Sequence, residues 1–594
     1  MNKIEFNKTS NIFINSGIVA LYRYLGQYER KNSNEKFNFR LLDDKLIVES
    51  ENLLSLLEEV YYFMGKDIYD TSSKKQLDKL ENVYYDVKKD EFHRFPKIYT
   101  YGLAELLTNN AQGTTKMKEN SPKIKNLEKE QPDVANKIKD YFDKNNLKLL
   151  SKVYLNEPYT KITTIDLQDK YWIDGKEYCY LTGEHFKSLV NAINISPFIK
   201  GLTTFNSFLN SSDGKVSQKG LYLLRFSPAL AMYSYYKGYD SFISSFFNSN
   251  SLLEINDLYK SEFFYENEIM QSWKMPFKRN IKLHNFSFAR KGKEDYSLDA
   301  AEDSFSPQEI TFLILLTFYK KKFADELTIQ NISKTETTDI LSLLKIDKSP
   351  ISLVTFKADK FASTLRPNFY EEYTNVKFVI QLIHKLETNK DKRVAIGEIW
   401  RGLIFKTSKT ESIKDYNKRL NLERQIRIKV IECLLKGKSI LPILESLFHK
   451  SYLLLANGDN SGYRRYDLIL EFLIIYEQTI NFKLNEMNES LQQKAISLGK
   501  SIGYAIINYG EPKNDTEKKA NAKNGRKYLI SLHKARTIDQ FRETLIRIQR
   551  KYLVSISNEI LENLNEKNYV AVKQYAQIGA LNSLNVVLSN QKES

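Results

Sequence analysis

The spacing of apolar residues changes at about residue 405 of this 594-residue chain, and this change constrains the fold more than any other feature. Before it, short runs with alternating apolar residues predict strands, for example within 153–180 and 280–293. After it, long segments with apolar residues at helical spacing follow one another to the end. The sequence therefore predicts an α+β protein, mostly α. It divides into a mixed N-terminal α/β domain with short strands over 1–405 and a C-terminal helical bundle over 406–594.

The chain is strongly basic. Lys and Arg number 89 against 73 Asp and Glu, which gives a net charge of +16 at pH 7, and the excess is not confined to one tail. Such a balance favours an anionic polymer as the partner. The alternative is a basic surface that serves only solvation. The apolar fraction of 42% is enough for well-packed cores.

The cysteines and the apolar segments indicate in which cellular compartment the protein is expected. Cys179 and Cys433 are far apart in the chain and predict no disulfide framework, so a reducing, cytoplasmic setting is expected. The first ten residues lack the apolar region of a secretory signal. The segment Ile310–Tyr319 is shorter than the roughly 20 residues of a bilayer span. A capping box from Ser306 to Glu309 precedes it, so a buried helix and no membrane contact are expected.

Two Gly-Lys-Ser triplets, beginning at Gly437 and Gly499, resemble the end of a phosphate-binding loop. That loop also needs a glycine five residues earlier, where this chain has Glu432 and Lys494. Both triplets fall in helical segments with no strand before them. No nucleophile elbow, zinc-protease motif or acidic cluster for two metals is present either. We therefore expect neither catalysis nor a cofactor.

The stretch YCYLTGEHFK, residues 178–187, resembles one knuckle of a zinc ribbon. Cys179 stands where the first sulfur would be, and Thr182 replaces the second. A structural zinc site needs about four soft ligands, and His185 is the nearest other candidate. We expect Cys179 to be a buried thiol at a turn, with Gly183 providing the backbone freedom and no zinc bound.

A polar, Lys-rich region covers about 108–145 and predicts a long exposed loop. Its first part combines amide side chains that can pair with base edges, a glycine that permits close approach, and lysines for phosphates. The alternative is an ordinary flexible loop. The residues expected to read a DNA duplex are Asn109, Asn110, Gln112, Gly113, Thr114, Lys116 and Lys118.

A second set of basic residues is expected to contact the nucleic-acid backbone. One example is the helix predicted after a capping box from Thr537 to Gln540, whose cations lie opposite its apolar face. The window 511–551 around it holds 12 Lys or Arg and 5 Asp or Glu. A cationic face suits phosphates, and an ordinary solvated face is the alternative. The full set is Lys278, Arg279, Arg290, Lys291, Arg464, Arg465, Arg526, Lys527, Arg547, Arg550 and Lys551.

Four places together resemble a known family. The opening SNIFINSGIVALYRYL is similar to a G-N-x-F-x-D-x-G-I-x-x-L signature, and CYLTGEHF stands where a first C-x-x-C pair would be. Phe205–Asn210 and the apolar Leu221–Tyr233 stand where a second pair and its following segment would be, and the C-terminal helices follow the family's order. Over nearly its whole length the chain resembles the large subunit of a type I-B CRISPR surveillance complex (Cascade), a family named for its double C-x-x-C motif. Of the four cysteines only Cys179 is present.

The resemblance implies a non-catalytic protein whose N-terminal domain reads the protospacer-adjacent motif in duplex DNA and helps to open it. The C-terminal bundle would lie along the displaced strand while the guide RNA reads the sequence. The implied partners are the CRISPR guide RNA, target double-stranded DNA, the backbone, guide-handle and small subunits of the complex, and a recruited helicase–nuclease. The region 178–233 would be a degenerate zinc ribbon.

The resemblance also implies that the last part of the chain, about 487–594, is similar to the small subunit and can be made from an internal start. Met487, the only methionine after Met275, is the candidate start, and the alternative is an ordinary residue at the start of a helix. The alternative to the whole assignment is a stand-alone basic protein that binds single-stranded RNA or DNA. Such a protein would use its tyrosines as stacking platforms.

Overall fold

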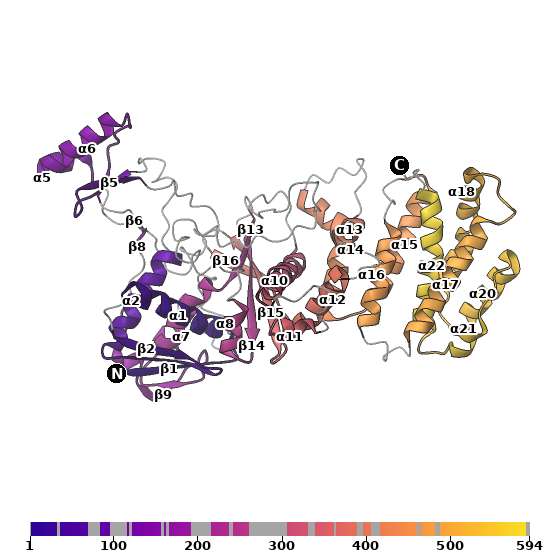
Figure 1. The fold of residues 1–594 in the computed structure, drawn as a ribbon, viewed down its shortest axis with the longest axis horizontal. Coiled ribbons are helices and arrows are strands. Elements are labelled where there is room, and N and C mark those ends of the chain that lie inside the picture. The colour runs from indigo at the N-terminus through magenta and orange to yellow at the C-terminus, as the bar shows by residue number, and fades with distance from the viewer. Residues whose placement is uncertain are drawn as a thin grey trace.

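The structure is a computed structural model. It describes residues 2–32, 36–68, 83–94, 116–117, 122–155, 160–161, 165–191, 215–236, 241–259, 306–330, 339–361, 364–388, 396–404, 416–459, 465–480 and 487–589. This part of the chain is elongated, with a mixed α/β region at one end and helices at the other (Figure 1). The predicted class, α+β and mostly α, is confirmed.

The N-terminal sheet has the order β1-β3-β2 and is antiparallel, with β1 (Lys3–Asn7), β2 (Phe37–Leu41) and β3 (Lys45–Ser50). The helices α1, α2 and α7 span Ile12–Lys31, Leu53–Ile68 and Gln218–Phe226. Helices α1 and α7 approach so closely that a Cβ atom on Gly17 would lie 2.1 Å from the carbonyl oxygen of Leu223. Only glycine fits there without a shift of the backbone.

A small lobe with its own apolar core stands apart from the main body (Figure 1). It contains β4 (Val83–Asp86), β5 (Glu91–Arg94), α5 (Ile124–Glu130), α6 (Pro132–Lys144) and β7 (Tyr154–Leu155). The two helices occupy the second half of the region expected to be an exposed loop, so that expectation is wrong for 124–144. The many polar residues concealed a sparse apolar face, which includes Ile138 and Phe142 and packs into the lobe's core.

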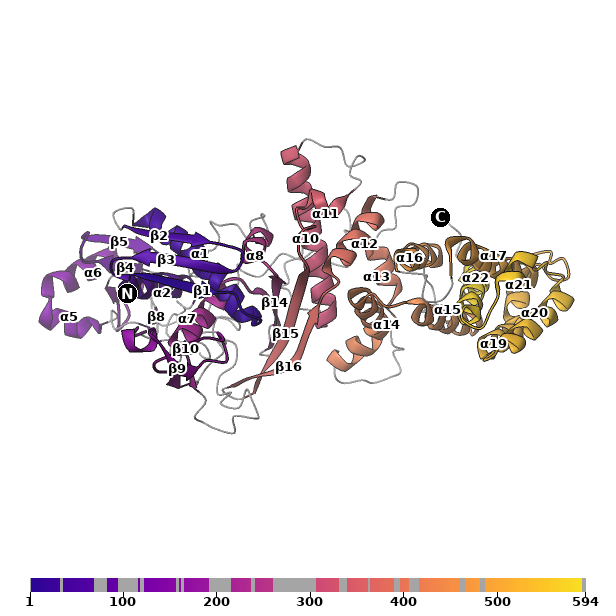
Figure 2. The same ribbon diagram turned by 90° about the horizontal axis from the view of Figure 1, so that it is seen from below.

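The largest sheet lies between the N-terminal end and the helical end (Figure 2). It has four antiparallel strands in the order β13-β14-β15-β16. Their bounds are Met232–Tyr236, Ser241–Ser249, Ile351–Phe361 and Thr364–Tyr373. The sequence patterns did not reveal the long β15–β16 hairpin, because β15 is a nearly continuous buried run rather than an alternating one.

Helix α10 (Pro307–Gln330) connects this sheet to the helices that follow. The expected capping box begins it: the Glu309 amide donates to Ser306 Oγ at 3.2 Å, and the Ser306 amide donates to Glu309 Oε2 at 2.7 Å. The other carboxylate oxygen of Glu309 forms a buried ion pair, 2.6 Å long, with Arg427 of α14. The pair joins α14 to α10, and loss of one partner from a buried ion pair is strongly destabilising. The prediction that Ile310–Tyr319 is a buried helix is confirmed.

From α12 onward every element that the structure describes is a helix. The bounds are α12 Val376–Thr388, α13 Ile396–Gly402, α14 Tyr416–Lys436, α15 Leu441–Ala456, α16 Tyr466–Thr479, α17 Glu489–Ile507, α18 Asp515–Asn524, α19 Arg526–Lys534, α20 Ile538–Tyr552, α21 Asn558–Asn563 and α22 Tyr569–Ser589. The remaining short elements are β6 Lys116–Met117, β8 Thr160–Lys161, β9 Asp174–Tyr178, β10 His185–Phe186, β11 Val190–Asn191, β12 Lys215–Val216, α8 Leu252–Leu258, α11 Ile340–Leu343 and two 3₁₀ turns, Asp169–Tyr171 and Ser227–Ala229. The last described strand ends at Tyr373, and the boundary at about 405 stays a prediction. No helix in the described ranges has the length and apolarity needed to cross a bilayer.

Helices α17 and α22 pack backbone against backbone. A Cβ atom on Gly499 would lie 2.0 Å from the carbonyl oxygen of Ala576, and one on Gly579 would lie 2.4 Å from that of Ile496. One Gly-Lys-Ser triplet therefore supplies a packing glycine inside α17. The other contains Gly437, whose φ of +62° ends α14. The triplet 499–501 lies within a helix as expected, whereas 437–439 lies in the turn between α14 and α15, so the expectation of a helical segment is wrong there.

Met487 is buried and directly precedes Asn488, whose side chain caps α17. A fragment beginning there would lose contacts between α15 and the later helices. The Tyr452 hydroxyl donates to the carbonyl of Ala522 at 2.8 Å, and Asn585 donates to the carbonyl of Phe448 at 3.1 Å. Such a fragment, which stays a prediction, would need a partner to cover the face that α15 covers here.

We predict that Gly499→Ala destabilises the bundle. In an exposed helix a Gly-to-Ala change raises the free energy of unfolding by about 1 kcal/mol. Overpacking a tight interface lowers it by about 1–3 kcal/mol. The added methyl group would meet main-chain atoms of α22, which cannot move aside as a side chain can. The midpoint of thermal unfolding, followed by circular dichroism, should fall by about 2–4 °C per kcal/mol. Lys500→Ala, at the exposed neighbouring position, is the control and should change little. A higher midpoint for Gly499→Ala would contradict the close approach.

Candidate nucleic-acid interface

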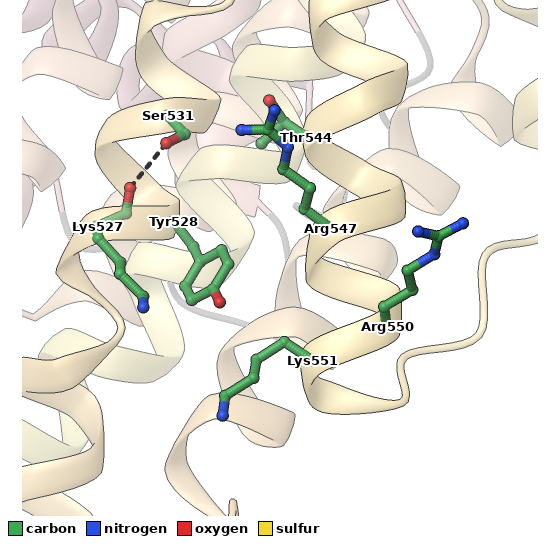
Figure 3. A pocket seen from close by; sticks show the side chains of 7 residues that line it. All are labelled: Lys527, Tyr528, Ser531, Thr544, Arg547, Arg550 and Lys551. Carbon is green, nitrogen blue, oxygen red and sulfur yellow. Dashed lines mark hydrogen bonds between the residues drawn. The ribbon is translucent and has the colours of Figure 1, made fainter.

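Helices α19 and α20 meet at a short turn and form the walls of a surface pocket of about 530 Å³ (Figure 3). Helix α20 begins at the expected cap, where the Gln540 amide donates to Thr537 Oγ1 at 3.2 Å. Its apolar face, with Phe541, Leu545 and Ile548, is buried in the bundle, so its opposite face points outward. The pocket is lined by Lys527, Tyr528, Ser531, Thr544, Arg547, Arg550 and Lys551.

The lining contains four cations, three hydroxyl groups and no carboxylate. One lining cation, Arg547, pairs with Glu543 at 2.6 Å one turn away on α20. Within the part of the chain that the structure describes, the Arg550 guanidinium has neither an ion pair nor a hydrogen bond. An acid-free pocket of this kind attracts anions, and the three hydroxyls add neutral hydrogen-bonding groups.

Three tyrosines lie beneath and beside these cations. Tyr552 contacts both Tyr509 and Tyr528 edge to face, each with ring centroids 5.3 Å apart. Burial raises the pKa of Tyr552 to about 12, so it stays neutral at physiological pH. The ammonium of Lys551 donates to the Tyr509 hydroxyl at 2.7 Å. This hydrogen bond raises the pKa of Lys551 above its ordinary value, so the ammonium stays charged.

The structure brings together four of the eleven residues expected to contact the backbone: Lys527, Arg547, Arg550 and Lys551. Arg526 is exposed beside them but does not line the pocket. Arg465 lies elsewhere, at the start of α16, and pairs with Asp467 at 3.3 Å. The residues of this set that fall outside the described part of the chain are Lys278, Arg279, Arg290, Lys291 and Arg464.

The residues expected to read duplex DNA stay predictions. Lys116 lies in β6, which pairs with β8, and its backbone alone is described. The others, which lie outside the described residues, are Asn109, Asn110, Gln112, Gly113, Thr114 and Lys118.

Sequence analysis did not identify the aromatic part of the pocket. The available signal was a repeated Lys-Tyr pair, Lys527-Tyr528 and Lys551-Tyr552, with one copy near the start of α19 and the other at the end of α20. Tyr509 could not have been assigned, because it reaches Lys551 across 42 residues of chain.

The knuckle around Cys179 is a tight turn, as expected. The Gly183 amide donates to the Cys179 carbonyl at 2.8 Å, and Gly183 has a φ of +72°. The Cys179 side chain is fully buried, and its sulfur accepts a hydrogen bond from the Ser217 amide at 3.2 Å. His185 lies opposite Tyr178 in the β9–β10 pair, and both are exposed. No group of three metal-binding side chains occurs among the residues that the structure describes.

Two residues at the start of α7 face this knuckle. Phe205–Asn210, the expected second pair, lies outside the described residues. At the start of α7, Ser217 and Gly220 have the same spacing as Cys179 and Thr182. A Cβ atom on Gly220 would lie 3.1 Å from Ser217 Oγ and 3.2 Å from Thr182 Cγ2. Two pairs with C-x-x-C spacing therefore converge here.

A scan of protein-family models and a search of curated proteins find no match to this chain. The resemblance to the Cascade large subunit consequently rests on the residues quoted for it.

We predict that removing a positive charge from α20 lowers the affinity for a polyanion and that removing a negative charge raises it. Arg550→Ala should weaken binding of a single-stranded oligonucleotide and reduce the slope of log K against log salt by about one. Glu543→Gln should strengthen binding about two- to fivefold, because it removes the carboxylate that competes for Arg547. Fluorescence anisotropy over a salt series measures both.

Two matched variants control for net charge. Lys513→Ala removes an exposed cation outside the pocket lining, and Asp539→Asn removes a carboxylate that pairs with Arg542 at 3.7 Å. Lys513→Ala is compared with Arg550→Ala, and Asp539→Asn with Glu543→Gln. If the two variants of each comparison change affinity equally, only net charge matters and the pocket has no special role.

We predict that the wild-type chain binds no zinc, whereas the triple variant Thr182→Cys, Ser217→Cys, Gly220→Cys binds one ion. With Cys179 the variant has four thiolates at converging positions, which is the donor set of a structural zinc site. Elemental analysis of protein purified in zinc-containing medium measures the stoichiometry. Adding Cys179→Ser to the triple variant should weaken retention of the metal against a chelator. A triple variant without zinc would show that the four positions cannot share one ion.

Proposed function

We propose that this protein is the non-catalytic large subunit of a CRISPR RNA-guided DNA surveillance complex. The observation that carries the proposal is the acid-free cationic pocket formed by α19 and α20 in the C-terminal helices. This is the part of the chain that, by resemblance, would lie along the displaced DNA strand.

The pocket's chemistry suits a phosphate backbone. Each phosphate neutralised by Lys or Arg releases counterions, so a small group of convergent cations gives useful affinity at physiological salt. Arg547 and Arg550 both carry planar guanidinium groups, which can donate two parallel hydrogen bonds to one phosphate. The neighbouring tyrosine offers a surface for bases, as in other single-strand binding sites.

The geometry around Cys179 supports the family resemblance. A double C-x-x-C motif requires two pairs of that spacing to face each other, and Cys179/Thr182 and Ser217/Gly220 do so. In the proposal the ribbon fold persists without metal, and the N-terminal domain reads the protospacer-adjacent motif through the residues of 109–118. Target cutting belongs to a recruited helicase–nuclease, and the chain acts in the cytoplasm with the other subunits of the complex.

Co-purification tests the proposal. The tagged full-length chain, expressed with its neighbouring gene products, should elute with RNA of one defined length and with the other subunits. The same chain expressed alone is the control and should not carry that RNA. RNA of mixed lengths in both preparations would favour a stand-alone single-strand binding protein, and absence of nucleic acid from both would overturn the proposal.

A further inference from the structure

Tyr528 is the aromatic side chain among the residues that line the pocket. Its ring lies between the side chain of Lys527 and those of Arg547 and Lys551, on the wall formed by α19 (Figure 3). The ring is partly exposed, and the ammonium of Lys527 lies 5.0 Å from its centroid.

We propose that Tyr528 stacks against a base of a single-stranded nucleic acid whose phosphates contact Arg547 and Arg550. The inference rests on the proposed function and deepens it, because it assigns the pocket a base contact as well as backbone contacts. The shared chemistry is an unpaired base next to a phosphate, which both single-stranded DNA and single-stranded RNA offer.

The ring of Tyr528 is held in place before any ligand arrives. Tyr552 packs edge to face against it, Tyr509 packs in the same way against Tyr552, and Lys551 lies 4.4 Å from the centroid of Tyr509. A ring fixed by neighbours loses little conformational freedom when a base stacks on it, so more of the stacking energy appears as affinity.

Lys527 provides a phosphate contact next to the stacking ring. Its ammonium faces the ring in the free protein and, like the Arg550 guanidinium, has no ion pair among the described residues. A stacking base would occupy the place over the ring and leave the ammonium to the adjacent phosphate. Duplex DNA cannot use the ring in this way, because its bases already stack on one another inside the helix. The pocket should therefore prefer single strands to duplex of equal charge.

An abasic oligonucleotide separates the base contact from the phosphate contacts. Full-length protein is titrated with two DNA single strands of equal length and charge. One strand carries thymine bases, and the other has abasic sugars in their place. Uridine RNA forms a third arm. We expect the thymine strand to bind roughly five- to a hundredfold more tightly than the abasic strand, with similar salt slopes, because stacking contributes per base and carries no charge.

Variants at Tyr528 complete the test. Tyr528→Phe should keep the preference for bases, whereas Tyr528→Leu should lose it and still bind the abasic strand as the wild type does. Equal binding of the thymine and abasic strands by the wild type would overturn the inference, as would an unchanged preference in Tyr528→Leu. Failure of every strand to bind would overturn the proposed function instead. The uridine arm shows whether the site prefers RNA to DNA.

Discussion

The close approach of α17 and α22 is the contact on which the C-terminal part of the molecule depends. It exists because Gly499, Gly503 and Gly579 carry no side chain where one helix meets the backbone of the other. Helix α22 then presents polar groups to its neighbours in a fixed register. The Tyr569 hydroxyl and the Lys573 ammonium each donate, at 2.7 Å, to a main-chain carbonyl of the turn between α19 and α20. That turn sets the angle between the two pocket walls. The three glycines thus place α22 where it can hold the turn from which both pocket walls extend.

Charge by itself does not make a binding site here. The chain carries a net +16, but many of its cations are already paired within the fold, as Arg465 is with Asp467. The pocket differs in that no carboxylate lines it: Glu543 pairs with Arg547, and the Arg550 guanidinium stays unpaired among the described residues. A cation without an internal partner gives up no protein contact when it binds a phosphate, whereas a paired one must first give up its partner. The arrangement of acidic groups therefore decides which basic residues are available to a ligand.

The sequence predicted local features well and tertiary ones poorly. The capping box at Ser306 depends on residues three positions apart and forms in full. At Thr537 the expected cap bond forms, but Gln540 Oε1 accepts from the Arg536 amide rather than from the Thr537 amide. The β15–β16 hairpin was missed because a continuously buried strand has no alternation to reveal it, and helices α5 and α6 were missed because a few apolar residues suffice for a small lobe. The pocket could be predicted only in part. Helical spacing placed Arg547 and Arg550 on one face, but nothing local indicates that Lys527 faces them from another helix.

The turn at Cys179 shows how a metal-like fold can be held by ordinary contacts. In a small zinc domain the metal supplies most of the folding free energy, because the core is too small to do so. Here the turn packs into the large core of the chain, and hydrogen bonds occupy the converging positions instead. The Cys179 sulfur accepts from the Ser217 amide, and Ser217 Oγ in turn caps α7 by accepting from the Gly220 amide at 3.0 Å. A nearly buried ion pair between Lys219 and Glu184, 2.7 Å long, joins the same two segments. These contacts hold the turn in place, and none of them involves a metal ion.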